Sequence, residues 1–541
     1  MRQSSRGYEE GAAPGAGPRV PEPGGPFGRD GAESRDSRRP RTGLRALRWS
    51  ATTLSVLILG TAGAGYFYYE HLNGNIQKGA RSSGDSKARK AAPNAAGQTP
   101  LNILLIGSDS RASDENVRLG GARKDRDNPP RGDVQMLIHL AADRESASVV
   151  TIPRDTRVDI PKCTDPKTGR TYPPVNTIIN ASLARGGAGC TLATWENLTG
   201  VYIDHWMTID FAGVVKMADA IGGVDVCVEQ NVWDRPLPGV PGGSGLKMRA
   251  GHRKVQGVQA LQWLRTRHAW GSDPLRARAQ HMYMNSMIRT LKAQNVFTDT
   301  GRLTDLAEAA TRSLHVSEEI GTVKKLYDLG MQLKTVPTDR ITMTTLPTAA
   351  DPENANHLIP AGADADRVWA MLRDDVPFDD KGGKPGAGKP SGAARKVSDD
   401  PAAADDEIGV LVRNATRSSI LGPVSGRASS VAQSLVGKGF SKAAADTSPA
   451  LSEERTVVRY PSAELAGDAQ RVAKSLGIPA GSVKRSTDVS GVTVVVGADW
   501  RTGTAYPKQP SPKAGDLPGD ADALNGSDTG KCMDVYAPYR W

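Results

Sequence analysis

The feature that most constrains this chain is an uncharged, mostly apolar run from Trp49 to Tyr69. At a rise of about 1.5 Å per residue, a helix of this length spans about 30 Å, which matches the hydrocarbon core of a bilayer. Six arginines lie between residues 35 and 48, and Glu70 follows the run directly. The excess of positive charge before the run predicts a cytoplasmic N-terminus and an extracellular remainder. We therefore expect a single-pass protein of the cell membrane.

A cleaved signal peptide is the rival interpretation, because Ala62-Gly63-Ala64 is an acceptable small-residue cleavage site. The region before the run is unusually long for a signal peptide, and the apolar run continues to Tyr69. We favour the uncleaved anchor. Residues 1–48, rich in Gly, Pro, Arg and Ser, are then expected to form a disordered cytoplasmic tail.

The rest of the 541-residue chain is too long for one hydrophobic core, so two or more domains are expected. Strand-like and helix-like runs alternate from Leu101 to about Val376, which is typical of an α/β domain. A low-complexity linker precedes a smaller unit with a βαβαβ-like pattern. The expected segments are a tail (1–48), a transmembrane helix (49–69), a spacer (70–99), a main domain (100–376), a linker (377–406), a small α/β domain (407–500) and a flexible tail (501–541).

Hydrophobic periodicity and turn residues locate the individual elements. In the main domain we expect strands at 101–107, 136–140 and 147–152, and helices at 191–198, 211–221 and 274–292. In the smaller unit we expect helices at 427–437 and 463–476 and strands at 456–460 and 492–496.

The net charge of +10 is compatible with nucleic acid, a membrane surface or phosphate-bearing substrates, and does not choose among them. The chain has four cysteines and no CxxC pair, which gives no support to a zinc ribbon or a thioredoxin-type motif. If the chain is exported, a disulfide is expected. We prefer Cys163–Cys190, because these two residues flank one polar excursion, although spacing alone leaves the connectivity open.

Two aspartates adjoin apolar strands in the main domain. Asp109 emerges with Arg111 at the end of the strand Asn102–Gly107, where open α/β sheets usually bind ligands. Asp133, in Arg131-Gly-Asp133, leads into the next strand. The simpler readings are a helix-capping turn at Asp109 and a solvated strand end at Asp133. Taken together, the two carboxylates predict a Mg²⁺ site completed by phosphate oxygens of a substrate.

Arginines recur in three further segments of the main domain. Several guanidinium groups in one cleft repel each other unless a multiply charged anion lies between them, and their planar forks suit phosphate oxygens. A single arginine of this kind is more often part of a surface salt bridge, but the clustering beside two carboxylates favours an anion site. The first segment carries Arg154, and the second, an expected extended run, carries Arg265 and Arg267. The third, the start of an expected helix, carries Asp273, Arg276 and Gln280.

Other catalytic classes lack their signatures. The sequence has no Gly-x-Ser-x-Gly elbow, so a serine-hydrolase interpretation has no support. The histidines His205, His268 and His281 show no metal-binding spacing with one another.

At this point the motifs identify a resemblance. The chain resembles the LytR-CpsA-Psr family over about residues 100–376, and residues 408–500 are similar to the LytR C-terminal module that often follows this domain in actinobacterial members. The motifs that carry the resemblance are Asn-Ile-Leu-Leu-Ile-Gly-Ser-Asp-Ser-Arg (102–111), Thr-Ile-Pro-Arg-Asp (151–155), Asn-Leu-Thr-Gly-Val-Tyr-Ile-Asp-His (197–205), Ala-Ile-Gly-Gly-Val-Asp-Val (220–226) and Ala-Leu-Gln-Trp-Leu-Arg-Thr-Arg-His (260–268).

The resemblance implies a three-layer α-β-α catalytic domain with a mixed central sheet. It implies a phosphotransferase that moves a glycopolymer, such as a teichoic acid, from a polyprenyl-pyrophosphate carrier to peptidoglycan through a phosphodiester, with Mg²⁺ as cofactor. The implied roles are catalysis by Asp109, Arg154 and Asp273, metal binding by Asp109 and Asp133, and pyrophosphate binding by Arg131, Arg154, Arg265, Arg267, Arg276 and Gln280.

The chain departs from the family pattern in a few places. Gly132 stands where Ser or Thr is usual, Ala279 where Arg is usual, and Ile178 where Lys is common. The interval between Asp109 and Asp133 is also longer than usual. These departures bear on metal affinity and on the choice of acceptor more than on the class of reaction.

Three alternatives to a transferase remain. A hydrolase would use the same arginines to attack the pyrophosphate with water. A non-catalytic wall-binding scaffold would leave the arginines without a role. A transcriptional attenuator would need a nucleic-acid contact, and no helix-turn-helix precedes Arg48, so we expect no nucleic-acid partner.

Overall fold

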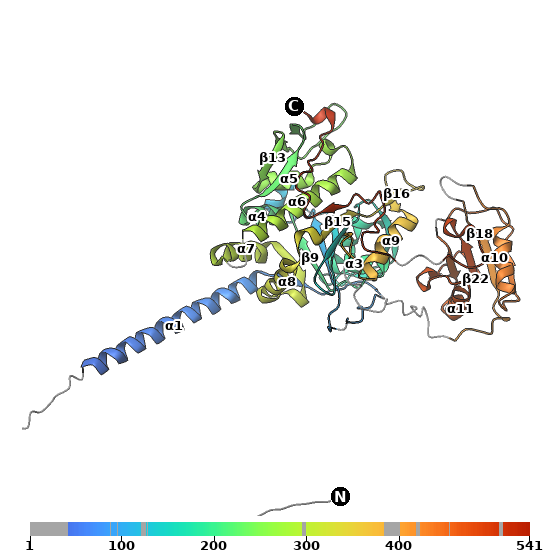
Figure 1. Cartoon of the computed structure of the whole chain (residues 1–541), viewed down its shortest axis with the longest axis horizontal. Helices are drawn as coiled ribbons and strands as arrows, with labels where there is room; N and C mark the ends of the chain where they lie inside the picture. Colours follow the sequence, from blue (N-terminus) through green and yellow to red (C-terminus); the bar gives the residue numbers. More distant parts are fainter. Residues whose placement is uncertain are drawn as a thin grey trace, which may run out of the picture. The chain divides into compact units, whose positions relative to one another are not determined.

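The computed structural model of the chain describes residues 42–541 apart from 87, 95, 121–125, 127, 295–298, 383–400, 418–421, 454 and 508–511. Most of the expected cytoplasmic tail and most of the expected linker therefore lie outside the described residues. The chain divides into two compact units, one up to Tyr66 and one from Phe67 to Trp541 (Figure 1).

Helix α1 (Thr42–Asn75) extends beyond the expected run at both ends. Its segment Leu47–Asn75 is the one helix among the described residues that is long and apolar enough to cross a membrane, judged by length and composition. Apolar side chains such as Leu54, Leu57 and Leu59 are exposed along it. An apolar helix without a protein cover is suited to lipid rather than to water.

The second unit is built on a mixed eight-stranded sheet. Strands β2, β3 and β4 are antiparallel neighbours in its middle, whereas β9 joins β2 and β15 joins β4 in parallel. In spatial order the strands are β1 (Gln77–Gly79), β14 (Leu314–Ser317), β9 (His205–Ile209), β2 (Leu101–Ser108), β3 (Gly132–Leu140), β4 (Ala147–Thr151), β15 (Ile341–Thr345) and β23 (Leu524–Asn525).

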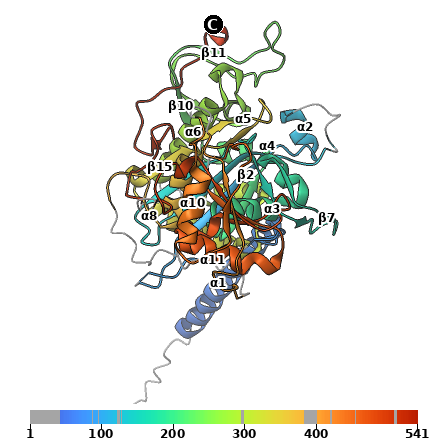
Figure 2. The same cartoon turned by 90° about the vertical axis from the view of Figure 1, so that its right-hand side faces the viewer.

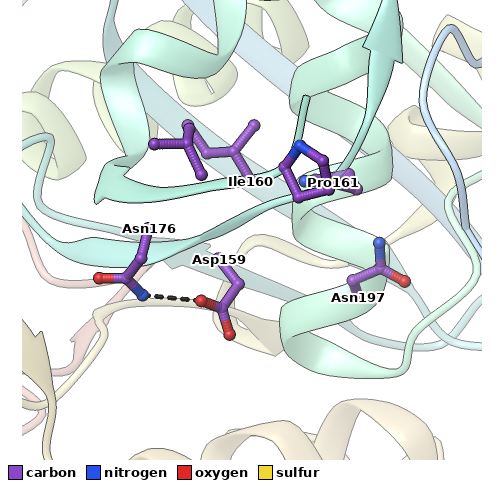
Figure 3. A pocket seen from close by; sticks show the side chains of 7 residues that line it. Asp159, Ile160, Pro161, Asn176 and Asn197 are labelled. Atoms are coloured by element: carbon purple, nitrogen blue, oxygen red, sulfur yellow. Dashed lines mark hydrogen bonds between the residues drawn. The ribbon is translucent and has the colours of Figure 1, made fainter. Parts of the chain in front are cut away.

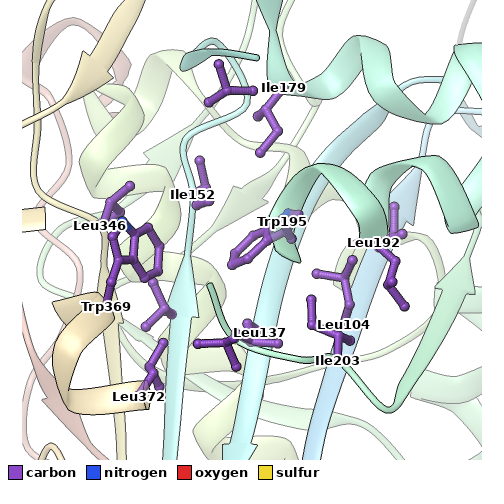
Figure 4. Close-up of a cluster of buried hydrophobic side chains, with 14 of the residues drawn as sticks. Leu104, Leu137, Ile152, Ile179, Leu192, Trp195, Ile203, Leu346, Trp369 and Leu372 are labelled. Carbon is purple, nitrogen blue, oxygen red and sulfur yellow. The ribbon is translucent and has the colours of Figure 1, made fainter. Parts of the chain in front are cut away.

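Both faces of this sheet are covered, because alternate side chains of each central strand point to opposite sides. Leu104 and Leu137 enter one core with Trp195 of α3 (Ser182–Thr199) and Trp369 of α9 (Gly362–Arg373), as Figure 4 shows. Met136 and its neighbours on the other face pack against α6 (Asp273–Ala293) and α8 (Val323–Thr335). The predicted three-layer α-β-α domain with a mixed central sheet is confirmed.

The remaining elements of this domain are short or lie beside the sheet. The helices are α2 (Asp114–Gly120), α4 (Phe211–Ala220), α5 (Gly257–Arg265) and α7 (Thr300–Ser313). The strands form small antiparallel pairs: β5 (Arg157–Ile160) with β8 (Val175–Ile178), β6 (Cys163–Thr164) with β7 (Thr171–Tyr172), β10 (Val224–Val228) with β13 (Gly251–Val255), β11 (Val232–Trp233) with β12 (Lys247–Met248), and β16 (Thr348–Ala350) with β17 (Leu358–Pro360).

Several described residues of the segment expected as a spacer, residues 70–99, contact the domain. Strand β1 extends the sheet by pairing with β14. Arg81 forms an ion pair of 2.8 Å with the buried Glu196, and Lys90 one of 2.7 Å with Asp204. The sequence analysis missed this packing because the partners of these polar residues lie more than a hundred positions away along the chain.

The smaller α/β unit has a five-stranded sheet in the order β19-β18-β22-β20-β21. Its core contains valines of β18 and β22 together with apolar side chains of both helices, and the expected elements are present. The elements are β18 (Val410–Asn414), α10 (Arg427–Val436), β19 (Ala443–Ala445), β20 (Val457–Tyr460), α11 (Ala466–Leu476), β21 (Val483–Arg485) and β22 (Val492–Val496).

The expectation of a flexible tail at 501–541 is wrong for its last thirty residues, 512–541. Strand β23 pairs with β15 in the main sheet, and Met533, Val535 and Tyr539 are buried in the core around β10 and α6. A disulfide joins Cys227 to Cys532, a pair that the sequence analysis left unassigned. The polar, Gly- and Pro-rich composition suggested disorder, but main-chain pairing and one covalent bond need little apolar sequence.

The preferred pair Cys163–Cys190 is a disulfide in the structure, with an S–S distance of 2.06 Å. Both cysteines are buried, and the bond joins β6 to α3. It therefore holds the excursion that carries β5 to β8 against the core of the domain.

Candidate functional site

The two aspartates expected to bind metal lie at one edge of the central sheet. Asp109 directly follows β2, and Asp133 is the second residue of β3, which runs antiparallel to β2. The Asp109 carboxylate accepts a hydrogen bond of 2.7 Å from the main-chain N–H of Arg131, and the Asp109 N–H donates to the Arg131 carbonyl at 3.1 Å. This reciprocal pair closes the end of the two strands and holds Asp109 in place.

Strand β4 brings Arg154 to the same edge. It ends at Thr151, opposite Met136 of β3, and Ile152-Pro153 carries the chain on to Arg154. The guanidinium of Arg154 lies 3.2 Å from a carboxylate oxygen of Asp133 and 3.3 Å from one of Asp155. These two ion pairs hold the guanidinium of Arg154 at the ends of β3 and β4.

A second group of charges lies at the start of helix α6. Ser272 caps this helix, and Asp273 in its first turn lies 3.3 Å from Arg267 and 3.6 Å from Arg276. Asp273 therefore forms ion pairs with two arginines. The N-terminal end of a 21-residue helix adds the partial positive charge of its dipole at the same place.

The electrostatic interactions join the two groups into one cluster. Burial raises the pKa of Asp133, while the charge of Arg154 lowers it, Asp109 raises it and Arg276 lowers it. Burial lowers the pKa of Arg276, and the neighbouring Arg154 and Arg267 lower it further against the effect of Asp273. Partly buried guanidinium groups repel one another because they carry the same charge, and a bound anion would stabilise them.

Arg154 has the opposite balance. Burial works against its charge, but Asp133, Asp155 and Asp273 together raise its pKa. Arg154 thus interacts with carboxylates from both groups and is the residue that links the sheet edge to the start of α6.

Arg265 is placed differently from the expectation. The sequence analysis put Arg265 and Arg267 on one extended run, but Arg265 is the last residue of helix α5. Its guanidinium donates to the carbonyls of Leu119 and Gly120 at the end of α2, at 2.8 and 3.0 Å, and lies 4.8 Å from the ring centre of Phe211. Burial lowers the pKa of Arg265, and the nearby charge of Arg111 lowers it further. Arg265 therefore supports α2 beside the cluster.

Gln280 is also placed differently. It is 5% exposed, and its amide donates to the carbonyl of Leu264 at 3.1 Å. In the structure Gln280 holds the end of α5 against α6, and its expected contact with pyrophosphate stays a prediction. Helical spacing of four residues correctly placed Arg276 and Gln280 on one face of α6, but it could not show that Gln280 is buried. Arg131, by contrast, is exposed beside Asp109.

Arg111, for which the sequence analysis expected no role of its own, lies beside Asp109. Its guanidinium lies 3.6 Å from the second carboxylate oxygen of Asp109. The signal was present in the sequence, because Arg111 stands two positions after Asp109 at the same strand end.

The donor chemistry of Asp109 and Asp133 fits a hard divalent cation. One oxygen of Asp109 is taken by the Arg131 N–H, which leaves the second oxygen and the Asp133 carboxylate facing cations. The raised pKa of Asp133 indicates a carboxylate that lacks full compensation for its burial. Two carboxylates completed by substrate phosphates form an ordinary Mg²⁺ site.

A separate surface groove lies away from this cluster, on the β5–β8 hairpin and the end of α3. Its volume is about 400 Å³. Figure 3 shows Asp159 and Asn176 hydrogen-bonded to each other at one side, with Asn197 beyond Pro161. None of the predicted site residues lines it, so the groove does not define the charged site.

The structure shows an α/β domain with a cluster of arginines and carboxylates at one end of its central strands, and comparison with known families identifies its family. A model of the LytR_cpsA_psr family matches residues 66–374, and a model described as LytR cell envelope-related transcriptional attenuator matches residues 407–500. The chain belongs to the LytR_cpsA_psr family and carries the C-terminal module found here at 407–500.

Individual relatives agree with this placement. The chain is 29% identical over 318 residues to the cell wall biosynthesis protein LcpA of Corynebacterium glutamicum, covering 54% of this chain and 58% of the relative. It is 31% identical over 175 residues to the polyisoprenyl-teichoic acid–peptidoglycan teichoic acid transferase TagU of Halalkalibacterium halodurans, covering 32% and 50%. The chain thus spans only about half of the length of these relatives. Among solved structures, the LytR-Csp2A-Psr enzyme from Actinomyces oris superposes with a TM-score of 0.38 at 17% identity, over 54% of this chain and 96% of the other.

Proposed function

We propose that this protein is a membrane-anchored phosphotransferase that moves a glycopolymer from a polyprenyl-pyrophosphate carrier to peptidoglycan through a phosphodiester bond. The observation that carries the proposal is the convergence of Arg154, Arg267 and Arg276 on Asp133 and Asp273 from three separate segments of the chain. The names of the relatives, a cell wall biosynthesis protein and a teichoic acid transferase, support the same class of reaction.

In the proposed reaction, the arginines bind the pyrophosphate and neutralise the charge that builds on the leaving group. A hydroxyl oxygen of the acceptor sugar attacks the phosphorus nearest the glycopolymer. The bond between that phosphorus and the bridging oxygen breaks, and polyprenyl phosphate leaves. Phosphoryl transfer of this kind asks the protein mainly for positioning and charge stabilisation.

The hydroxyl proton needs an acceptor at the sheet edge. Asp109 is one candidate, and the main-chain hydrogen bond from Arg131 holds its carboxylate at a fixed position. Asp133 is the other candidate, and burial raises its pKa. Mg²⁺, held by Asp109 and Asp133, would supply further neutralisation of the phosphate charge when bound.

Membrane anchoring and an extracellular catalytic domain belong to the same proposal. The candidate span Leu47–Asn75 is followed without a gap by the folded domain, since Ile76 is buried and β1 starts at Gln77. The arginines before residue 49 favour a cytoplasmic N-terminus. A lipid-linked donor would then reach the site from the membrane in which the protein is held.

The test is incubation of the full chain, in detergent, with a polyprenyl-pyrophosphate-linked glycan and peptidoglycan. Mass spectrometry of the digested wall should find the glycan joined to a wall sugar through a phosphodiester, and free polyprenyl phosphate should accumulate. Release of a soluble glycan phosphate without attachment would indicate the hydrolase instead. No turnover of the donor in either form would contradict both.

A further inference from the structure

The folded C-terminal segment presents exposed aromatic rings beside the arginine cluster. Trp233 is 37% exposed, Tyr536 is 55% exposed and Trp541 is 47% exposed. Figure 1 shows the end of the chain near β13, and Figure 2 shows it near β11, where Trp541 donates a hydrogen bond to Val232. We call Trp233, Tyr536 and Trp541, together with the cations Arg235 and Lys247, the aromatic patch.

The rings of Trp541 and Trp233 are held by polar contacts. The indole N–H of Trp541 donates to the carbonyl of Val232 at 3.0 Å, and the side-chain amide of Asn231 donates to the main-chain oxygen of Trp541 at 3.0 Å. Trp233 and Lys247 are cross-strand partners on β11 and β12. Fixed rings lose little entropy on binding, which makes them suitable anchors for a ligand.

Covalent and main-chain contacts hold the segment that carries Tyr536 and Trp541. The disulfide Cys227–Cys532 ties it to β10, and Met533 and Cys227 pair through a main-chain hydrogen bond of 2.9 Å. The N–H of Val535 donates to the side chain of Gln230 at 2.9 Å. The polar sequence of residues 512–541 thus forms a fixed surface of the main domain.

The aromatic patch adjoins the start of α6, where the anion site lies. The N–H of Tyr536 donates to the carbonyl of Ala269 at 2.8 Å, and a Cβ on Gly271 would lie 3.5 Å from Tyr536. Ala269 and Gly271 lie, in sequence, between Arg267 and Asp273, which form an ion pair with each other. Tyr539, next in the segment, stacks on His268 with ring centres 6.1 Å apart.

The chemistry of the aromatic patch fits a saccharide that carries negative charge. Flat aromatic faces bind the apolar faces of sugar rings, whereas Lys247 and Arg235 supply positive charge. Lys247 lies 4.5 Å from the ring centre of Trp233 and 4.7 Å from that of Trp541, and Arg235 lies 4.8 Å from the Trp233 ring. The cations cover part of the rings, and the exposed remainder faces solvent.

We propose that the aromatic patch is the binding surface for the anionic glycopolymer of the donor, at the point where its first sugars leave the arginine cluster. This inference rests on the proposed function for the direction in which the polymer runs. Arg267 would bind the pyrophosphate, and Ala269, two residues further along the chain, accepts a hydrogen bond from Tyr536. Sugars attached to the pyrophosphate would therefore lie within reach of Tyr536. Trp233 and Trp541 then contact sugars further along the polymer.

The experiment measures binding of carrier-free polymers to the full chain in detergent, by calorimetry. The probes are a phosphodiester-linked polysaccharide that contains hexose rings, a poly(glycerol phosphate) that has charge without sugar rings, and neutral dextran. The variants are Tyr536→Ser, whose main-chain bond to Ala269 does not need the ring, and Trp233→Ala. Tyr327→Ala removes a ring of equal exposure to Trp233, at 37%, on helix α8 and serves as the matched control.

Each variant of the aromatic patch should weaken binding of the hexose-containing probe about fivefold, the effect expected of one aromatic contact, with the melting temperature retained. Poly(glycerol phosphate) should bind equally to all variants, and Tyr327→Ala should match the wild type. Equal affinity of all variants for the hexose-containing probe would overturn the proposal. So would binding of neutral dextran as tight as that of the charged polymer.

A membrane surface is the rival occupant, because aromatic and basic residues also gather at bilayer interfaces. Hydrogen exchange separates the two. Protection of residues 529–541 should rise on addition of the hexose-containing probe, whereas protection produced by phosphatidylglycerol nanodiscs alone would overturn the proposal. None of these probes contains pyrophosphate, so the binding result stands or falls independently of whether the chain transfers a glycopolymer.

Discussion

At the scale of single residues, the site depends on pairs in which a carboxylate orients an arginine. Asp273 holds Arg267 and Arg276, and Asp133 holds Arg154. Arg267 is half exposed, and an exposed ion pair contributes only about 0–1 kcal/mol to stability, so its pair with Asp273 is of little use for folding.

Replacement of Arg267 by Lys tests whether its planar fork binds the pyrophosphate. The variant keeps the charge but removes the two parallel donors, so transfer should fall by about 10²–10³, the usual loss for one transition-state donor. The matched control is Arg302→Lys. Arg302 pairs with Asp299 at 3.8 Å and its side chain is 52% exposed, against 50% for Arg267. Transfer rate and melting temperature are measured on both. Full activity of Arg267→Lys would show that Arg267 forms only a surface salt bridge and does not bind pyrophosphate through its planar fork.

Asp133 provides a prediction for stability against pH. Burial raises the pKa of this carboxyl above its ordinary 3.8, so the folded protein binds its proton more readily than the unfolded chain does. Stability therefore falls as the pH rises from about 3.8 through the raised pKa, and the carboxylate lowers stability at neutral pH. Asp133→Asn should raise the melting temperature at pH 7 and abolish transfer, with the thermal gain shrinking in acid. A lower melting temperature at pH 7 would mean that the ion pair with Arg154 outweighs burial.

At the scale of elements, helix α6 is the part whose position decides the site. The C-terminal segment holds it from outside: Arg278 pairs with Asp522, and Arg289 donates to the carbonyl of Gly526 at 2.8 Å. Strand β23 and the disulfide to Cys532 fix that segment at both ends. The small α/β unit at 407–500 thus stands, in sequence, between α9 and the last strand of the main sheet.

Cys532→Ser should loosen this arrangement. Loss of a native disulfide typically costs about 2–5 kcal/mol, and here it also frees the segment that supports α6. We expect a lower melting temperature and faster hydrogen exchange over residues 524–541. The anion site should weaken in parallel, visible as poorer pyrophosphate binding. Lys531→Ser, next to the cysteine and paired with Asp528 on the surface, is the control. Unchanged exchange over residues 524–541 would show that the noncovalent contacts alone hold the segment.

At the scale of the whole molecule, the proposed location of the reaction depends on the candidate membrane span Leu47–Asn75 and on its orientation. With the N-terminus in the cytoplasm, a protease added to intact protoplasts should degrade the segment after Asn75, and antibodies should find only the part before it. A cytoplasmic protein of the same cells controls for lysis. Complete protection of the domains would place them inside and remove the proposed extracellular reaction.

Several features of the chain were determined by the sequence alone, because they depend on local patterns. The apolar run before Glu70, the strands around Leu104 and Leu137, and the helix that starts near Asp273 follow from the spacing of apolar residues. The membership of Asp109, Asp133 and Arg154 in one site follows from polar residues placed at strand ends, where neighbouring strands meet.

The tertiary structure alone decided what depends on distant partners. Arg265 donates to the carbonyl of Leu119 and Gln280 donates to the carbonyl of Leu264, contacts that the residue types alone did not indicate. Residues 70–99 and 512–541 are polar enough to suggest disorder, yet they complete the domain through ion pairs, strand pairing and the Cys227–Cys532 bond. Such contacts join residues up to 305 positions apart, so they cannot be predicted from the spacing of neighbouring residues in the sequence.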